Sequence, residues 1–515
     1  MRLITEGEKR VMMWIKKYGI IFYVNMMFGV LVYFTIMSEH LVNSNDGLLY
    51  TSQYVAGRWE VSSGRGILPY FDKLRAGVMS VSLNTILMLG IISVTGTLIL
   101  EMFDVKNKIV GMLMVMILVA NPVTCAILAY SYTAVNYGLS FFLSVFGVYC
   151  LYRLGNISGI LSGGLCIALS MGSYQAYFSV TCLLILLLLI KTILQNKELK
   201  ASGWFLLKSV ISVILGGVIY IVLIKLLMMR FNVEISSYKG ADQVSLKNLF
   251  LNFPQALQKC YQNFFVFFFR HKMFLNLSGV VQFLLNIFIG ITVFCVIYQF
   301  VSLIRRNRKY AMLFLGCIFM IPLGGSAITL IVIGSNSRLM SMSMIVFIIL
   351  LTVLIPGEGV FSFLAKRGYC AFLLLFLWVN ILSVTNEQLA LKEGKTASVG
   401  LAEAVFSELI AGNYLEESYT IALVGRPSVN ELFARREAWD KVIGENRFGD
   451  GWHSDNEFWS NLLLEYCGIS LNFTTNEQYN ILCQKEEVAE MPEFPKAGSI
   501  MEIDGIVVVK ISEKY

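Results

Sequence analysis

The sequence predicts an all-α polytopic membrane protein of about 11 transmembrane helices with a small α/β domain at its C-terminus. Of the 515 residues, 57% are hydrophobic and only 15% are charged, and the mean hydropathy is +0.68. Apolar runs of about 17–25 residues, each long enough to cross a bilayer as a helix, recur from the N-terminus to about residue 385. Beyond that point the composition becomes that of a soluble domain.

Charge is divided unevenly between these two parts. Residues 386–515 carry 22 of the 34 acidic residues and 11 of the 41 basic ones, so this tail is near −11 and residues 1–385 are near +18. Basic residues beside apolar runs face anionic lipid headgroups, whereas the acidic tail has a solvated composition. We therefore expect a polytopic membrane domain at 1–385 and an extracytoplasmic α/β domain at 386–515. The basic residues form no stripe on a soluble domain, so no nucleic-acid partner is expected.

The first span is expected at about 18–37, after a segment rich in Lys and Arg. It is longer than a signal-peptide core and has no small-residue cleavage site, which indicates a retained anchor with its N-terminus in the cytoplasm. The later spans are expected at 78–100, 109–131, 135–152, 157–172, 176–194, 204–227, 279–304, 310–333, 339–355 and 368–385.

The connections expected inside are basic, as the positive-inside rule requires. They carry Lys106 and Lys108, Arg153, Lys197 and Lys200, the segment 305–309, and Lys366 with Arg367. An odd number of spans then places the tail outside.

Two outer segments are long. The first outer loop covers 38–77, and the large outer loop covers 228–278. The large loop has apolar and aromatic residues at near-helical spacing, which predicts interfacial helices that lie on the membrane or dip into it.

The tail is expected to contain strands and a helix. The segment 419–425 (YTIALVG) is typical of a buried strand, 499–512 predicts a hairpin across Asp504-Gly505, and 428–444 has helical periodicity. Cys467 and Cys483 can pair if the tail lies in an oxidising compartment, and two free thiols are an equally good interpretation.

Several chemistries are excluded by missing motifs. There is no HExxH, no CxxC pair, no GxSxG and no DxD, and the chain has only three histidines. An ATP-driven machine and a metalloprotease are disfavoured. We expect no cofactor and no obligatory metal site.

The outer acids are the remaining candidates for chemistry. Four lie in the first outer loop, and Glu39 and Asp46 are closest to the first span. A carboxylate there can accept a proton from an attacking hydroxyl. The same loop supplies Arg58 and Arg65, which can hold a phosphate leaving group by charge-assisted hydrogen bonds. The alternative for each of these residues is a solvated loop charge.

Four further residues have two interpretations each. Arg338 begins a late span and either snorkels to the surface or meets an anion, with phosphate favoured. Trp59 fits an interface anchor better than a substrate platform. Tyr174 and Gln175 either hydrogen-bond sugar hydroxyls or satisfy each other between helices.

Three segments carry a family resemblance: SNDGLLYTSQYVAGRWEVSSGRG after the first span, NPVTCAILAYSYTAVNYGLSFFLSVFGVYCLYR, and ALSMGSYQAYFSV. Together they resemble a bacterial glucosyltransferase family that includes the serotype-converting O-antigen glucosyltransferases. The resemblance implies a GT-C-type enzyme of the bacterial cytoplasmic membrane. It also implies a polyprenyl-phosphate sugar as donor, a cell-surface glycan as acceptor, and a catalytic acid in the first outer loop.

The resemblance is carried over residue by residue. Asp46 matches the second acid of the family's acidic pair, while Asn45 replaces the first, so the base is either Asp46 or Glu39. Arg58 and Trp59 match a GRW element, Tyr174 and Gln175 match a YQ element, and Arg338 matches an arginine at the start of a late span.

The expected reaction is an inverting displacement that moves a hexose, with glucose favoured, onto the glycan. A transporter or flippase of lipid-linked saccharide is the alternative. It would need polar residues through the middle of the spans, where Leu, Ile, Val and Phe predominate.

Overall fold

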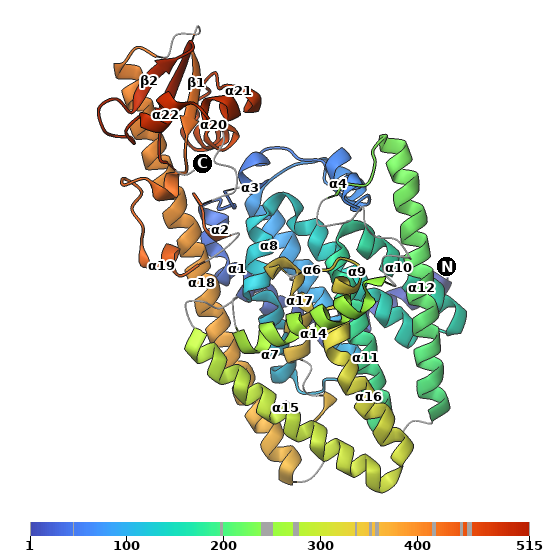
Figure 1. Ribbon diagram of the computed structural model, residues 1–515. Coiled ribbons are helices and arrows are strands. Elements are labelled where there is room, and N and C mark those ends of the chain that lie inside the picture. The colour runs from blue at the N-terminus through green and yellow to red at the C-terminus, as the bar shows by residue number, and fades with distance from the viewer. Residues whose placement is uncertain are drawn as a thin grey trace.

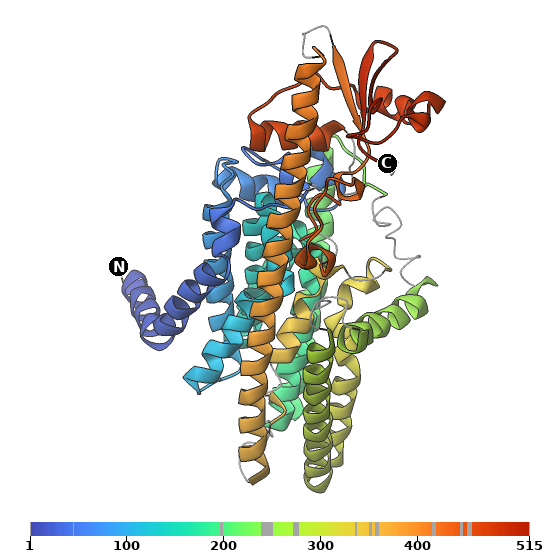
Figure 2. The ribbon, with the colours of Figure 1, turned by 90° about the vertical axis from the view of Figure 1, so that its left-hand side faces the viewer.

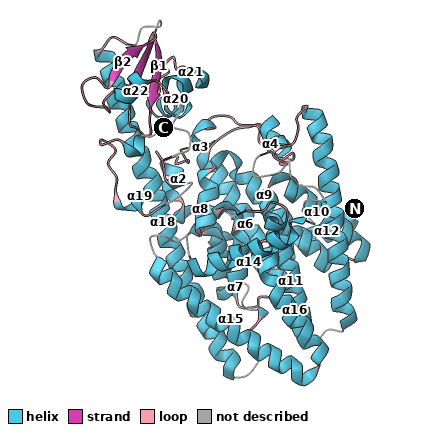
Figure 3. Cartoon of the chain, viewed as in Figure 1, coloured by secondary structure: helices cyan, strands magenta, loops and turns pink. Residues whose placement is uncertain are grey.

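A computed structural model describes residues 2–44, 46–195, 199–237, 251–270, 278–334, 337–349, 353–355, 360–414, 419–442, 446–450 and 456–513. The described residues are mainly helical, with one small sheet in the tail (Figures 1 and 3). Figure 2 shows that the tail and the α15–α16 junction lie at opposite ends of an elongated molecule.

Nine helices of the described residues contain segments long and apolar enough to cross a membrane. They belong to α1 (Arg2–Val32), α6 (Val81–Met102), α9 (Ser131–Arg153), α10 (Asn156–Ser173), α11 (Phe178–Leu194) with η1 (Gln175–Tyr177), α12 (Leu199–Phe231), α15 (Ser278–Arg306), α16 (Arg308–Gly325) and α18 (Val360–Ala411). The prediction of a polytopic helical protein is confirmed.

Within the described residues, the candidate spans number fewer than the expected 11. A tenth arises only if α7 (Lys108–Val119) and α8 (Pro122–Ala129), bent by 41°, cross together. In the segment expected at 339–355, residues 350–352 lie outside the described part, and the described part contains η5 (Arg338–Met340) and α17 (Met342–Ile349), whose eight described residues are too few to cross a bilayer.

The bend between α7 and α8 follows from Asn121-Pro122. The proline has no backbone N–H and occupies the first turn of α8, where none is needed. The Asn121 Oδ1 accepts hydrogen bonds from the backbone N–H groups of Val123 and Thr124, both at 3.0 Å. This cap starts a new helix in a new direction.

Helix α18 is 52 residues long. At 1.5 Å per residue it extends over about 78 Å, more than twice the hydrocarbon thickness of a bilayer. The domain boundary expected after residue 385 therefore falls inside one continuous helix, which reaches the tail (Figure 2).

The first outer loop folds into short helices over the ends of the spans: α2 (Phe34–Ser38), α3 (Asp46–Leu49), α4 (Arg58–Ser62) and α5 (Leu68–Leu74). In the large outer loop, the described residues contain α14 (Phe253–Arg270), and 238–250 and 271–277 lie outside the described residues. Helix α14 packs on α16 and on η4 (Ala327–Leu330), with Phe264 and Phe268 facing inward and Phe265 and Phe269 exposed.

The tail contains a three-stranded sheet in the order β1 (Thr420–Val424), β3 (Ile506–Lys510), β2 (Ile500–Ile503). Strands β1 and β3 are parallel, and β2 and β3 form the predicted hairpin. Its turn, Asp504-Gly505, has positive φ at both residues, as a type I′ turn requires. The remaining elements are η7 (Pro427–Val429), α19 (Glu437–Asp440), α20 (Asn456–Leu462), η9 (Leu463–Cys467), α21 (Asn476–Leu482) and α22 (Glu486–Glu490).

The helix expected over 428–444 is wrong in extent. The described residues there form only the end of η7 and one turn, α19. Cys467 and Cys483 are free thiols.

The tail and the membrane helices share a hydrophobic core. One continuous cluster of buried side chains includes Phe141 of α9, Phe376 of α18 and Trp459 of α20. The tail is thus packed against the membrane part and does not hang from a linker.

Candidate functional site

Asp46 opens α3 in the first outer loop and is partly exposed. Its Oδ2 accepts a hydrogen bond from the Tyr132 hydroxyl at 3.3 Å. Tyr132 lies in the first turn of α9, so this contact joins the loop to the end of a membrane helix. Asn45, which is expected to replace the first acid of the family's acidic pair, lies outside the described residues.

Tyrosine rings surround this contact. The Tyr50 ring lies 4.5 Å from that of Tyr54 and 4.9 Å from that of Tyr132, centroid to centroid, and Tyr54 meets Tyr132 edge-on at 4.6 Å. Such tilted and edge-on pairs add to the energy of burial. Burial and then the carboxylates of Glu60, Asp46 and Glu457 raise the pKa of Tyr50, so its hydroxyl stays neutral and can donate a hydrogen bond.

Glu39 is held by a different element. Its carboxylate forms an exposed ion pair with Lys392 of α18 at 2.7 Å, and Lys395 Nζ donates to its backbone oxygen at 2.9 Å. The hydrogen bond from Lys392 lowers the pKa of Glu39, which makes this carboxylate a weaker proton acceptor. The two acids that the sequence left as candidates for the base therefore differ in their surroundings: Lys392 binds the carboxylate of Glu39, and the Tyr132 hydroxyl binds that of Asp46.

Arg65 is positioned by stacked tyrosines. Its Nη1 donates to the Tyr137 hydroxyl at 3.3 Å, and the Tyr137 ring stacks on Tyr174 with centroids 4.1 Å apart and planes 14° from parallel. Asp46 bonds to Tyr132 and Arg65 bonds to Tyr137, so an acid and a cation of the first outer loop both contact the first two turns of α9.

Gln175 fastens the same loop. Its Nε2 donates to the Ser63 carbonyl at 3.1 Å and to the Tyr220 hydroxyl at 3.3 Å, and that hydroxyl donates to the Gly64 carbonyl at 3.1 Å. Gly64 has φ +82°, and a Cβ there would lie 2.7 Å from Gln175 Nε2. Tyr174 and Gln175 therefore hold the segment that carries Arg65.

Arg58 and Trp59 lie farther out on α4. Arg58 Nε donates to the Phe231 carbonyl at the end of α12, at 3.1 Å, and is exposed. Trp59 is 55% exposed. Its exposure agrees with either an interface anchor or a surface for ligand.

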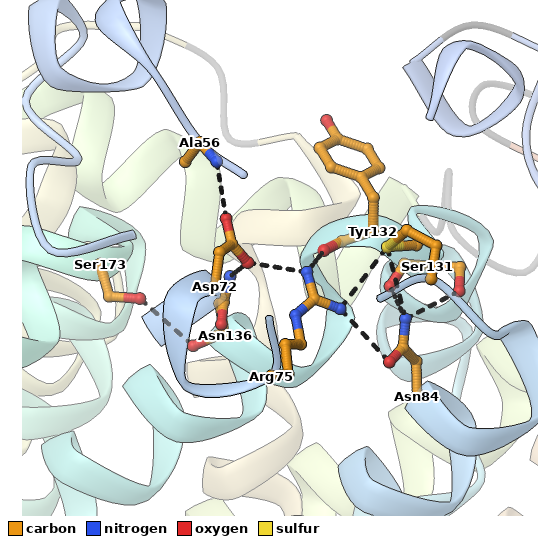
Figure 4. A network of polar contacts seen from close by, with 9 residues as sticks. Ala56, Asp72, Arg75, Asn84, Ser131, Tyr132, Asn136 and Ser173 are labelled. Carbon is orange, nitrogen blue, oxygen red and sulfur yellow. Dashed lines mark hydrogen bonds and ion pairs between the residues drawn. The ribbon is translucent and has the colours of Figure 1, made fainter. Parts of the chain in front are cut away.

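Asp72 is fully buried and saturated with donors (Figure 4). Its Oδ2 accepts from the backbone N–H of Ala56 at 2.8 Å, and its Oδ1 accepts from Asn136 and from Arg75, each at 2.7 Å. Arg75 also donates to Asn84 and to the Tyr132 carbonyl. This network ties the first outer loop to α6 and α9, and it holds the backbone of Tyr132 in place.

Arg338 lies in a second buried cluster. Its Nη1 pairs with Glu387 Oε1 of α18 at 2.8 Å, and the side-chain amide of Asn446 in the tail donates to Glu387 Oε2. Asn446 also lies 3.7 Å from the Cys125 sulfur of α8. The anion that Arg338 meets in this structure is thus a carboxylate of the same chain.

Sequence reasoning did not find Tyr132, Tyr137 or Glu387. The first two lie in the aromatic stretch AYSYTAVNY at the start of α9, and the density of tyrosines there was the available signal. Glu387 gave no signal because its partner is 49 residues away. Among the described residues, no group of three His, Cys, Asp or Glu side chains is arranged to hold a metal ion.

A family model described as glucosyl transferase GtrII matches residues 50–356. This range contains Arg58, Arg65, the tyrosines of α9, Gln175 and Arg338, and it begins four residues after Asp46. No curated protein and no solved structure gave a significant match.

Proposed function

The chain belongs to the glucosyl transferase GtrII family, and we propose that it transfers a hexose, in the first place glucose, from a polyprenyl-phosphate donor to a cell-surface glycan. The family makes it a glycosyltransferase, and its apolar helices make it a membrane protein. The proposal adds the lipid donor, the GT-C-type arrangement and the site in the first outer loop. It also adds the orientation, with the loop and the tail outside a bacterial cytoplasmic membrane.

The observation that carries the proposal is the state of Asp46. It is the partly exposed acid of the loop that a membrane helix orients, through the Tyr132 hydroxyl. Glu39 is the weaker candidate because Lys392 binds its carboxylate and lowers its pKa. A general base needs an accessible, oriented carboxylate within reach of the acceptor hydroxyl.

The proposed reaction is a single displacement. Asp46 accepts the proton of an acceptor hydroxyl while that oxygen forms a bond to the anomeric carbon of the sugar. The bond from this carbon to the phosphate oxygen breaks, and its electron pair leaves with the polyprenyl phosphate. Attack from the face opposite the leaving group inverts the anomeric centre.

Arg65 and Arg58 are proposed to hold the departing phosphate. Negative charge builds on the phosphate as the bond breaks, and guanidinium groups already in place stabilise it. Tyr174 and Gln175 are proposed as positioning residues, because they fix Arg65 and the Ser63-Gly64 turn. Trp59 is proposed to contact lipid or donor at the membrane interface. Arg338 can bind the donor phosphate only if that phosphate displaces the Glu387 carboxylate.

The test is turnover with labelled polyprenyl-phosphate glucose and a glycan from source cells that lack this gene. Asp46→Asn should lower turnover by about 10²–10⁴-fold, the usual contribution of a general base, and Glu39→Gln should lower it only a few-fold. If Asp46→Asn keeps full activity, Asp46 is not the base.

The same assay separates the enzyme from a flippase. A transferase releases polyprenyl phosphate and labels the glycan. A flippase moves labelled lipid across a liposome without releasing its phosphate. A reporter enzyme fused to the C-terminus tests the orientation, since the proposal requires it to be active only outside the cytoplasm.

A further inference from the structure

The tail lies directly beside the candidate base. Helix α20 packs on α3, the short helix that begins with Asp46 (Figure 1). Pockets for ligands are often built where two domains meet, because each side contributes part of the wall. The contact therefore brings residues of the tail next to the first outer loop.

Helix α20 is held rigidly in this place. Phe458 and Trp459 are buried in the shared core, with exposures of 4% and 0%. Asn456 Oδ1 accepts from the backbone N–H of Leu423 in β1 at 3.1 Å, and its amide group donates to the Thr474 hydroxyl. Glu457, between Asn456 and Phe458, is exposed and has a fixed backbone position.

Glu457 and Asp46 lie on the two helices that meet at this junction, and the partly exposed Tyr50 directly follows α3. The Tyr50 ring lies 4.9 Å from that of Tyr132, whose hydroxyl donates to Asp46. After burial, both carboxylates contribute to raising the pKa of Tyr50. Carboxylates accept hydrogen bonds from hydroxyl groups, and a neutral tyrosine both stacks on apolar sugar faces and donates a hydrogen bond. Two carboxylates beside a neutral tyrosine suit a neutral ligand with many hydroxyl groups, whereas they would repel an anionic ligand.

We infer that the junction of α20 and α3 binds the acceptor glycan, with the Glu457 carboxylate and the Tyr50 hydroxyl bonded to glycan hydroxyls beside Asp46. This inference rests on the proposed function and assigns the tail a role in it. Glu457 is then a specificity-determining residue supplied by the tail, and Asp46 receives a hydroxyl that the tail has already oriented.

Binding of the glycan to the full-length protein in detergent, without donor, tests this directly. The probe is the labelled glycan from source cells that lack this gene. Glu457→Gln should weaken binding about tenfold, the effect of one hydrogen bond to a charged group, and in turnover it should raise the acceptor KM while leaving the donor KM unchanged. Tyr50→Phe should weaken binding several-fold.

The matched control is Glu477→Gln. Glu477 is also an exposed glutamate in the first turn of a seven-residue helix of the tail, α21, which packs with the small cluster behind the sheet. It should leave binding and both KM values unchanged. If both variants weaken glycan binding equally, the effect of Glu457→Gln is a general loss of helix stability, and the inference is overturned.

Absence of saturable binding to the wild-type protein, or equal binding by wild type and Glu457→Gln, also overturns it. The proposed function fails separately. If Asp46→Asn keeps full turnover while Glu457→Gln still weakens glycan binding, the base is wrong and the acceptor site stands.

Discussion

The four acids of the first outer loop differ in what surrounds each carboxylate. Asp72 is fully buried with its hydrogen bonds satisfied, and Glu60 caps its own helix through the backbone N–H of Gly57. Glu39 is exposed and paired, and Asp46 is partly exposed and oriented. A fully buried carboxylate that already accepts three hydrogen bonds within the chain is not accessible to substrate, so burial and partners assign a structural role to Asp72 and are consistent with the proposed role of Asp46 as the base.

Asp72→Asn should therefore act on stability. It leaves the Arg75 guanidinium without its anion in a buried network, a change that typically costs about 3–5 kcal/mol. Asp46→Asn should change stability by no more than about 0.5 kcal/mol. Thermal unfolding of both variants in one detergent measures the difference, and equal melting temperatures would refute the structural role of Asp72.

The Glu39–Lys392 pair predicts a small pH effect. A carboxylate whose pKa is lowered in the folded state contributes stability above its unfolded-state value of 4.5 and loses it as the pH falls through the folded value. Because the pair is exposed, Glu39→Gln should lower the melting temperature only slightly at pH 7. The difference from wild type should vanish well below pH 4.5, and a difference that grows on acidification would contradict the assignment.

At the scale of elements, α18 joins the membrane part to the tail. It contains a segment long and apolar enough to cross a bilayer, and it continues as the surface on which the tail packs. Gly394 marks the closest approach, because a Cβ there would lie 2.4 Å from the Phe448 carbonyl oxygen and 2.9 Å from Trp439 Nε1. Trp439 Nε1 itself donates to the Phe448 carbonyl at 2.8 Å. The tail segment thus approaches α18 where the helix has no side chain.

Gly394→Ala should loosen the tail. A methyl group cannot fit against a backbone carbonyl, and overpacking of this kind costs about 1–3 kcal/mol. Gly400→Ala is the matched control in the same helix, since open space surrounds its Cβ position and alanine favours the helix by about 0.5–1 kcal/mol. Protease sensitivity of the tail should rise in the first variant and stay level or fall in the second. Equal sensitivity would show that the tail does not pack at Gly394.

At the scale of the whole molecule, a buried charge cluster connects three distant parts of the chain. Arg338 of η5, Glu387 of α18 and Asn446 of the tail meet beside Cys125 of α8. A buried ion pair is costly to break from one side but can be replaced as a unit. The cluster therefore fixes the relative position of the tail and the membrane helices.

Arg338→Met should destabilise the protein by about 3–5 kcal/mol, because it leaves the Glu387 carboxylate buried without its cation. The double variant with Glu387→Met should recover most of this loss. Donor binding then distinguishes the two roles of Arg338. A folded double variant with normal donor KM assigns it to structure alone, whereas a raised donor KM supports contact with the lipid phosphate.

Much of the architecture followed from local patterns. Apolar run length predicted the membrane helices, and Asp504-Gly505 between apolar strands predicted the hairpin, because each depends on neighbours in the chain. Sequence reasoning missed the continuation of α18 from residue 385 to residue 411. This part of the helix is not apolar enough to be predicted as a membrane span, because only one of its faces is buried against the tail. It overextended the helix at 428–444, where buried contacts of Trp439 and Phe433 outweigh helical periodicity.

The sequence by itself determined that this chain is a helical membrane protein whose acids and arginines gather in the first outer loop and whose motifs resemble glucosyltransferases. It could not rank Glu39 against Asp46. Only the tertiary structure shows what each carboxylate contacts, because the partner of Glu39 is 353 residues away and that of Asp46 is 86 residues away. The accessibility and basicity of a carboxylate depend on such partners in space, and no local pattern of residues records them.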